Sequence, residues 1–317
     1  MSLASECVFR VEDSMIYDSV IVGAGPAGLC AALYLARAEK RVLLIEKAAF
    51  GGQITFSPKI ENYPGIPAAS GNEIADILLS QVMELGVEIE VDEVVSVEEG
   101  EDKKRVVTAG GVFEAYSVIL ATGAHHRLLG LEGEDALIGE GISFCAVCDG
   151  AFYKGKDVIV IGGGNSAKQE AILLAKLCKK VTVLQNLPYL TGEKKLSDEL
   201  LALDNVEVVY SATVTAYLGD GEFRGVKASV AGEERAFYGD ACFLAIGLAP
   251  NLQTFDRLVA LDPWGYAEAD ETCETKTAGI FVAGDCRRKR IRQISTATAD
   301  GVNAAMGVIS YLDSIGV

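Results

Sequence analysis

The feature that most constrains the fold is a glycine-rich turn that joins an apolar strand to a helix. The strand runs from Tyr17 to Val22, the turn reads Gly23-Ala24-Gly25-Pro26-Ala27-Gly28, and a helix rich in Ala and Leu follows to about Ala38. A second strand, Arg41 to Ile45, ends on Glu46. This order of elements predicts the first βαβ unit of a dinucleotide-binding fold.

The residues of this turn fit that chemistry. Gly23 permits the tight turn, Gly25 lets a pyrophosphate approach the backbone, and Gly28 lets the helix pack on the strand. Pro26 is tolerated in a first helical turn, where free N–H groups attract an anion. Glu46 comes about 20 residues later, where an acid can accept hydrogen bonds from an adenosine ribose. An accidental glycine-rich turn is the alternative.

The same pattern occurs again in the second half of the chain. An apolar strand from Asp157 enters the turn Gly162-Gly163-Gly164-Asn165-Ser166-Ala167, and a helix to Lys179 and a strand from Lys180 to Leu184 follow. Strands that end in small-residue turns, at 118–123 and 245–250, mark crossings between the two modules. We therefore expect an α/β fold of two Rossmann-like three-layer dinucleotide-binding domains, the second inserted into the first. Residues 1–124 and 249–317 would form the first, and 125–248 the second.

Three more segments complete the expected elements. Apolar residues at helical spacing predict a helix from Gly71 to Gly86. The segment from Gly279 to Asp285 is an apolar strand with a polar end, and a helix should begin near Gln293.

The charge balance excludes some partners. Asp and Glu total 45 against 28 Lys and Arg, which gives a formal net charge of −17. Such a chain repels phosphate backbones, so we expect no nucleic-acid partner. No apolar run has the roughly 18 to 20 residues of a membrane span, and the charged start, Met1 to Asp13, does not resemble a secretory signal. We expect a cytoplasmic protein without a membrane partner.

Two of the eight cysteines are closely spaced, in the run Cys145-Ala146-Val147-Cys148-Asp149. A pair at this spacing can close a small disulfide ring and reopen it by exchange. A half zinc site and inert packing are the alternatives, but a second ligand pair at zinc spacing is missing, so no metal is expected. Asp149 can supply the proton for a leaving thiolate if burial raises its pKa. A solvent-facing turn or a helix cap is the other interpretation of Asp149.

Over almost its full length the chain resembles the low-molecular-weight thioredoxin reductases. The matching motifs are 23–28, Gly51-Gly52-Gln53, 61–65, Ala121-Thr122-Gly123, 145–149, Gly284-Asp285 and Arg292-Gln293. The resemblance implies FAD in the first module, thioredoxin as a partner, a homodimer, and rotation of the inserted module between two positions. In one position Cys148 would face the flavin, and in the other Cys145 would attack a thioredoxin disulfide. The expected FAD-binding residues are Gly23, Gly25, Pro26, Ala27, Gly28, Glu46, Lys47, Gly52, Gln53, Asn62, Ala121, Thr122, Gly123, Gly284, Asp285, Arg292, Gln293 and Ile294.

The second module departs from the family. NADPH-dependent members carry a histidine and arginines after the strand that follows the second glycine loop, and those arginines hold the 2′-phosphate. Here the aligned stretch from Gln185 to Thr191 has no basic residue, and no acid that would suit NAD. Losing two charged hydrogen bonds costs roughly 3 to 6 kcal/mol, or about 10²- to 10⁴-fold in affinity. Lys194 and Lys195 come later and offer only partial compensation.

A basic run suggests another electron donor. After Asp285 the chain reads Cys286-Arg287-Arg288-Lys289-Arg290-Ile291-Arg292. We expect Arg287, Arg288, Lys289 and Arg290 to form an electrostatic dock beside the flavin for acidic ferredoxin. A solvated loop, or pairing with the chain's own acids, is the alternative. Both departures resemble the ferredoxin-dependent flavin thioredoxin reductases.

The expected function is therefore transfer of electrons from reduced ferredoxin through FAD and the Cys145–Cys148 disulfide to thioredoxin. Three alternatives stay open. One is an NAD(P)H-dependent thioredoxin reductase with an altered nucleotide pocket. Another is a diflavin enzyme with a second FAD at residues 162–167. The last is a redox sensor that does not turn over.

Overall fold

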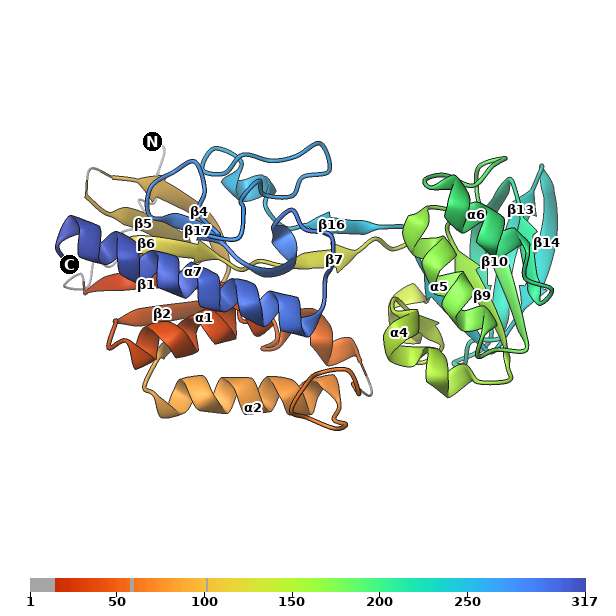
Figure 1. Cartoon of the computed structure of the whole chain (residues 1–317), viewed down its shortest axis with the longest axis horizontal. Helices are drawn as coiled ribbons and strands as arrows, with labels where there is room; N and C mark the ends of the chain where they lie inside the picture. The colour runs from red at the N-terminus through yellow and green to blue at the C-terminus, as the bar shows by residue number, and fades with distance from the viewer. Residues whose placement is uncertain (1–14, 58–59, 101) are drawn as a thin grey trace, which may run out of the picture.

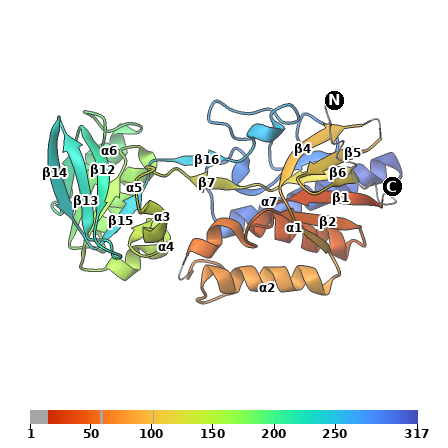
Figure 2. The same cartoon turned by 180° about the vertical axis from the view of Figure 1, so that it is seen from behind.

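The computed structural model describes residues 15–57, 60–100 and 102–317. The start of the chain, for which the sequence analysis expects no secretory signal, lies outside these residues. The described chain forms two lobes joined by a narrow two-stranded ribbon (Figures 1 and 2). The expected α/β fold with two Rossmann-like units is confirmed.

The first lobe is built on a sheet with strand order β3-β2-β1-β6-β5-β4, in which β17 also pairs with β6. Five of its strands, β1, β2, β3, β6 and β17, pair with one another in parallel. The other two, β4 and β5, pair antiparallel. The strands are β1 (Ile16–Val22), β2 (Val42–Glu46), β3 (Glu88–Val91), β4 (Val94–Glu99), β5 (Lys104–Thr108), β6 (Val112–Leu120) and β17 (Ile280–Val282).

Helices cover one face of this sheet. They are α1 (Pro26–Arg37), α2 (Gly71–Glu84) and α7 (Ile294–Ile315), with the short η1 (Gly52–Phe56), η3 (Gln253–Phe255) and η4 (Gly284–Cys286) nearby. Alternate residues of β1 face opposite sides, so that Ile21 packs on α1 and α7 while Val20 packs on the core behind the sheet. Gly301 lets α7 approach α1 closely, because a Cβ there would overlap the carbonyl oxygen of Ala27.

The second lobe is also layered. Its five-stranded parallel sheet has the order β11-β10-β9-β15-β8, and a three-stranded antiparallel sheet, β12-β13-β14, packs on one face. The strands are β8 (Ile142–Ser143), β9 (Asp157–Ile161), β10 (Lys180–Leu184), β11 (Val206–Val209), β12 (Ala212–Leu218), β13 (Gly225–Val230), β14 (Glu233–Tyr238) and β15 (Ala241–Leu244). The helices are α3 (Glu134–Leu137), α4 (Ala146–Asp149), η2 (Gly150–Tyr153), α5 (Asn165–Ala175) and α6 (Lys194–Leu201).

The chain leaves and re-enters the first lobe through adjacent strands. Strand β7 (Ala124–His126) pairs antiparallel with β16 (Leu248–Pro250), and this ribbon spans the gap between the lobes (Figure 1). Among the described residues, each buried apolar cluster draws its members from one lobe only. The second lobe is thus an insertion with its own core.

One expected boundary is wrong by a turn. Helix α5 ends at Ala175 instead of reaching Lys179. The backbone N–H of Lys179 donates to the carbonyl of Lys156, and the Gly155 N–H donates to the carbonyl of Leu177. These bonds to another segment replace the helical pattern after Ala175. Within 15–57, 60–100 and 102–317, none of the helices combines the length and apolar character that a membrane crossing requires.

Candidate active site

The first glycine loop adopts a conformation that requires glycine at its key positions. Gly23 has φ +103°, and a Cβ on it would lie 2.5 Å from the carbonyl oxygen of Ala121. A Cβ on Gly28 would overlap the carbonyl oxygen of Gly23. A Cβ on Gly25, by contrast, would meet only the carbonyl oxygen of Gly51, at 4.0 Å. The loop therefore leaves room for a ligand at Gly25, at the N-terminus of α1.

Glu46 is held beside this loop by the backbone. Its Oε2 accepts a hydrogen bond from Ala24 N at 2.8 Å, and its Oε1 accepts one from Ala48 N at 2.9 Å. A carboxylate oxygen can accept further hydrogen bonds, so both oxygens remain able to bind ribose hydroxyls. Lys47, the next residue, lies at the surface with its Nζ 3.2 Å from Glu93 Oε1.

The other residues expected at the dinucleotide converge on the same end of the sheet. Gly52 lies against Gly25, since a Cβ on Gly52 would be 3.5 Å from the Gly25 Cα. A Cβ on Gly284, which has φ +82°, would be 2.8 Å from the Cβ of Ala27. Asn62 Nδ2 donates to Gln293 Oε1 at 3.2 Å, just before Ile294 begins α7. Gln53 lies on η1 with an exposed side chain.

Two buried oxygens at this end have no hydrogen-bond partner: Thr122 Oγ1 and Asp285 Oδ1. Burial raises the pKa of Asp285, while Lys289 and Arg292 lower it. A buried polar atom without a partner is costly and calls for a ligand or water. Hydroxyl-bearing FAD provides donors for both oxygens, and the glycine-lined loop provides space for its pyrophosphate, so the residues present fit FAD.

The cysteine pair lies in the second lobe, on the side that faces the first (Figures 1 and 2). Cys145 and Cys148 form a disulfide, and Cys145 is the N-cap of the short helix α4. The backbone N–H of Cys148 donates to Cys145 Sγ at 3.2 Å. A hydrogen bond to sulfur favours the thiolate form after reduction. Val147, between the cysteines, is 62% exposed, so a partner protein can reach this turn.

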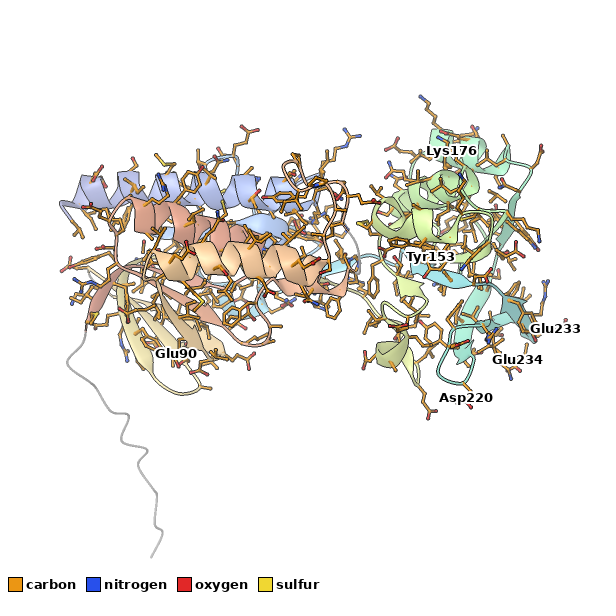
Figure 3. All side chains as sticks on the ribbon, turned by 90° about the horizontal axis from the view of Figure 1, so that it is seen from below. Glu90, Tyr153, Lys176, Asp220, Glu233 and Glu234 are labelled. Atoms are coloured by element: carbon orange, nitrogen blue, oxygen red, sulfur yellow. A yellow bond between two sulfur atoms is a disulfide. The ribbon has the colours of Figure 1, made fainter. Side chains whose placement is uncertain are left out.

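Asp149 follows the disulfide directly and ends α4. Burial raises its pKa, and the hydroxyl of Ser143, which donates to Oδ2 at 2.6 Å, lowers it in part. Its Oδ1 is buried without a hydrogen-bond partner. Tyr153, inside the second lobe in Figure 3, has a pKa that is raised by burial and by nearby Asp149. This surrounding favours the protonated acid.

Sequence reasoning missed three residues around the disulfide. Ser143 Oγ accepts from Cys145 N at 3.2 Å while donating to Asp149, and it thereby links acid and cysteine. His126 of β7 stacks on Phe144, with ring centroids 4.3 Å apart. Burial, with a contribution from His125, lowers the pKa of His126 to about 4, so its ring is neutral. Ser143 and Phe144 directly precede Cys145, whereas His126 comes from β7, and no local motif marks any of the three.

The second glycine loop differs from the first in the residue that packs on it rather than in its open position, since a Cβ on Gly164, the counterpart of Gly25, would meet only Thr191 Oγ1 at 3.7 Å. By strand register, Leu184 corresponds to Ile45, so Gln185 takes the position of Glu46. The Gln185 side chain fills the space at Gly163, because a Cβ there would lie 2.5 Å from Gln185 Nε2. Gln185 Nε2 in turn donates to the carbonyl of Tyr189 at 3.0 Å. A neutral amide held by its own loop thus replaces the acid of the first module.

The start of α5 is also occupied by the chain itself. Asn165 Oδ1 accepts from Glu193 N at 2.8 Å, and its Nδ2 donates to a carboxylate oxygen of Glu193 at 3.4 Å. The fully buried Lys168 donates to the Glu193 carbonyl at 2.7 Å. Lys194 and Lys195 are exposed on α6. A carboxylate at the N-terminus of α5 opposes the phosphates of a nicotinamide dinucleotide.

The expectation of four exposed cations after Asp285 is wrong for two of them. Arg287 is buried in a two-bond ion pair with Asp300, and Lys289 is buried between Asp285 and Asp300. Asp285 directly precedes the run, whereas Asp300 lies 11 to 13 residues beyond these cations on α7. Arg288 and Arg290 are exposed, although Arg288 lies 3.4 Å from Glu268. Arg292 covers the ring of Tyr266 at 4.1 Å.

Comparison with known proteins gives consistent matches over nearly the whole chain. Residues 17–301 match the family described as pyridine nucleotide-disulphide oxidoreductase. A thioredoxin reductase of Listeria monocytogenes is 39% identical over 306 residues, 96% of each chain. One of Bacillus subtilis is 37% identical over 308 residues, 96% of this chain and 98% of the relative. The crystal structure of the Streptococcus pyogenes thioredoxin reductase has a TM-score of 0.87 at 39% identity and covers 94% of this chain and 99% of that one.

Proposed function

Because the chain belongs to the thioredoxin reductases within the pyridine nucleotide-disulphide oxidoreductases, we propose that it reduces thioredoxin with electrons from reduced ferredoxin. These reductases are flavoproteins, and FAD is the cofactor of this chain. When bound, FAD supplies a redox group that accepts electrons singly and delivers them in pairs. The residues of the chain bind this group and carry out the thiol chemistry.

The observation that carries the choice of donor is the chemistry around the second glycine loop, where a carboxylate is present and the expected cations are missing. Gln185 lies on Gly163, and Glu193 is bound to Asn165 at the helix start where a pyrophosphate would lie. No residue from 185 to 191 is basic. A 2′-phosphate would thus find a neutral loop and a nearby carboxylate, which supports a donor other than NADPH.

The energies of the carriers allow ferredoxin as the donor. Plant-type ferredoxins lie near about −400 mV, and thioredoxin lies near about −270 mV. The difference of about 130 mV corresponds to roughly 6 kcal/mol for two electrons. The reaction runs toward reduced thioredoxin.

The thiol chemistry needs three residues. After reduction of the disulfide, the Cys145 thiolate attacks the thioredoxin disulfide, an S–S bond forms between the proteins, and the thioredoxin bond breaks. Cys148 then attacks Cys145 Sγ, which restores the Cys145–Cys148 disulfide and releases the thioredoxin dithiol. Asp149 gives a proton to the leaving thiolate. We assign Cys148 to the flavin side and the expected first-module residues to FAD.

Arg288 and Arg290 form the remaining donor dock that we propose, with the exposed Ile291 beside them. We expect the double variant Arg288→Glu/Arg290→Glu to slow flavin reduction by ferredoxin by about tenfold or more at low salt, because steering raises association rates 10- to 10³-fold. Anaerobic stopped-flow measurement of flavin bleaching at several salt concentrations checks this. The variant should also depend less on salt.

The matched control is Lys194→Glu/Lys195→Glu, which makes the same charge change on exposed lysines of the other lobe. Ferredoxin should reduce the control at the wild-type rate. Equal rates for all three proteins would remove the dock. If the control alone lost reduction by NADPH, the alternative with an altered nucleotide pocket would replace our proposal.

We also propose the finer assignments that accompany this function. Residues 1–124 and 249–317 would form the FAD domain, and 125–248 the inserted domain that rotates. A homodimer is supported by exposed apolar side chains on α2, including Ile77 and Met83. Five buried free cysteines, at positions 30, 178, 242, 273 and 286, are compatible with a reducing cytoplasm. A measured ratio of one flavin per chain would exclude the diflavin alternative.

A further inference from the structure

Four charged side chains form a network between the end of β17 and the first turns of α7, in which three are buried and Asp285 is partly exposed. Arg287 donates from Nε and Nη2 to the two carboxylate oxygens of Asp300, at 3.0 and 2.7 Å. Asp300 Oδ2 also accepts from the backbone N–H of Gly284 at 3.0 Å. Lys289 Nζ and Asp285 complete the group. With two cations and two carboxylates, the network is neutral when all four are ionised.

Lys289 is the side chain that connects Asp285 to the rest of this network. Its Nζ is 3.4 Å from Asp285 Oδ1 and 3.2 Å from Asp300 Oδ2, and its side chain is 8% exposed. It also donates to the carbonyl of Thr296 in the first turn of α7, at 3.4 Å. Arg287 uses its remaining Nη1 donor on the carbonyls of Ala269 and Asp270. The ammonium of Lys289 is therefore fixed from three directions.

The contact between Lys289 and Asp285 is an ion pair that leaves the acceptor free. Asp285 Oδ1 lies within ion-pair distance of the ammonium but takes no hydrogen bond of good geometry. Burial of the Asp285 carboxyl oxygens raises its pKa, and the neighbouring ammonium of Lys289 counteracts this by favouring the charged form. An oriented, charged oxygen without a hydrogen bond is what a ligand hydroxyl needs.

We propose that Lys289 is a positioning residue for the flavin, which holds the Asp285 carboxylate charged and oriented to accept a hydrogen bond from FAD. This inference rests on the proposed assignment of Asp285 to FAD. It explains why a cation of the basic run is buried rather than available to a partner protein.

Two consequences follow from removing the ammonium. The network of Asp285, Arg287 and Asp300 would hold one uncompensated negative charge, and Asp285 would lose the cation that orients its oxygen. Since electrons added to the cofactor meet the field of nearby charges, the extra carboxylate charge opposes reduction. Lys289→Met should therefore shift the flavin midpoint potential to a more negative value. It should also weaken FAD binding by about tenfold or more, the loss expected for one charged hydrogen bond.

The test measures FAD affinity of the apoprotein by fluorescence titration, and the midpoint potential of the holoprotein by anaerobic spectroelectrochemistry. Lys276→Met is the matched control, because it removes the same charge from an exposed lysine of the same lobe that has no part in the network. The control should match the wild type in both measurements, and Lys289→Arg should keep the wild-type potential. Wild-type affinity and potential in Lys289→Met would overturn the proposal.

Two further variants keep the outcomes distinct. If Lys289→Met does not fold, Lys289→Gln and Lys289→Arg are compared, and equal potentials in these two would also overturn the proposal. Asp285→Asn tests the assignment beneath it: unchanged FAD affinity would remove Asp285 from the flavin site and with it the role of Lys289. If Asp285→Asn weakened FAD binding and Lys289→Met did not, Asp285 would keep its place at the flavin and Lys289 would have no role in positioning it. Neither measurement involves ferredoxin or thioredoxin, so the donor proposal is tested separately.

Discussion

Replacement of Cys145 by Ser is expected to lower thioredoxin reduction by more than about 10³-fold, because the variant lacks the sulfur that forms the bond to the partner. A hydroxyl does not ionise at neutral pH and cannot exchange with a disulfide. Reduction of the bound flavin by the electron donor should persist, since Cys145 is assigned to the partner side of the reaction. Steady-state thioredoxin turnover and stopped-flow flavin bleaching measure the two steps separately.

The control for Cys145 is one of the cysteines that lie away from the disulfide. Cys178 is a buried free cysteine between α5 and β10, and burial and Asp157 raise the pKa of its thiol. Cys178→Ala should keep turnover near the wild-type value. If Cys145→Ser retained wild-type turnover, electrons would reach thioredoxin by another route and the proposed thiol pathway would be wrong.

Replacement of Asp149 by Asn is expected to lower thioredoxin reduction by about 10²- to 10⁴-fold, the usual contribution of a positioned acid. The amide fits the same space beside Ser143 but cannot give a proton to the leaving thiolate. Turnover measured from pH 6 to 9 should lose the alkaline decline that ionisation of the wild-type acid causes. A wild-type rate in this variant would show that solvent supplies the proton.

Ser143→Ala should keep the acid Asp149 but move the pH at which it ionises. The Ser143 hydroxyl favours ionised Asp149, so its removal raises the pKa of Asp149 further. The alkaline limb of the pH profile should move to higher pH than in the wild type. A limb that stayed in place, or moved to lower pH, would separate Ser143 from the acid.

The raised pKa of Asp149 in the wild type also makes stability depend on pH. Because the pKa of Asp149 is higher in the folded than in the unfolded chain, its contribution to stability is present below the unfolded value of about 3.9 and lost as pH rises through the folded value. Asp149→Asn has no ionisable group there. The free energy of unfolding of Asp149→Asn, measured relative to that of the wild type, should therefore increase over this pH range and stay constant at higher pH.

Local patterns in the sequence are sufficient for the modules but not for their side-chain partners. The turn at Gly23 is a backbone requirement that a short motif expresses completely, since a Cβ there meets Ala121. The burial of Arg287 and Lys289 depends on Asp300, which lies about two helical turns after Gln293 on α7. A run of cations reads as exposed until that tertiary contact is known.

The second glycine loop illustrates the same limit. The missing arginines between Gln185 and Thr191 are visible in the sequence. That Gln185 fills the space at Gly163 is not, because it depends on the register between β9 and β10 and on the side-chain direction. Likewise Ser143 ends a two-residue strand, and only the fold brings its hydroxyl to Asp149.

The most direct test of the account is an anaerobic titration of the holoprotein with reduced ferredoxin, NADPH and NADH, followed by the flavin absorbance. We expect reduced ferredoxin to bleach the flavin absorbance completely and rapidly, and one equivalent of NADPH or NADH to bleach it little or not at all. Rapid bleaching by one equivalent of NADPH would contradict it, because the loop that holds Gln185 and Glu193 would then accept the nucleotide it is argued to exclude.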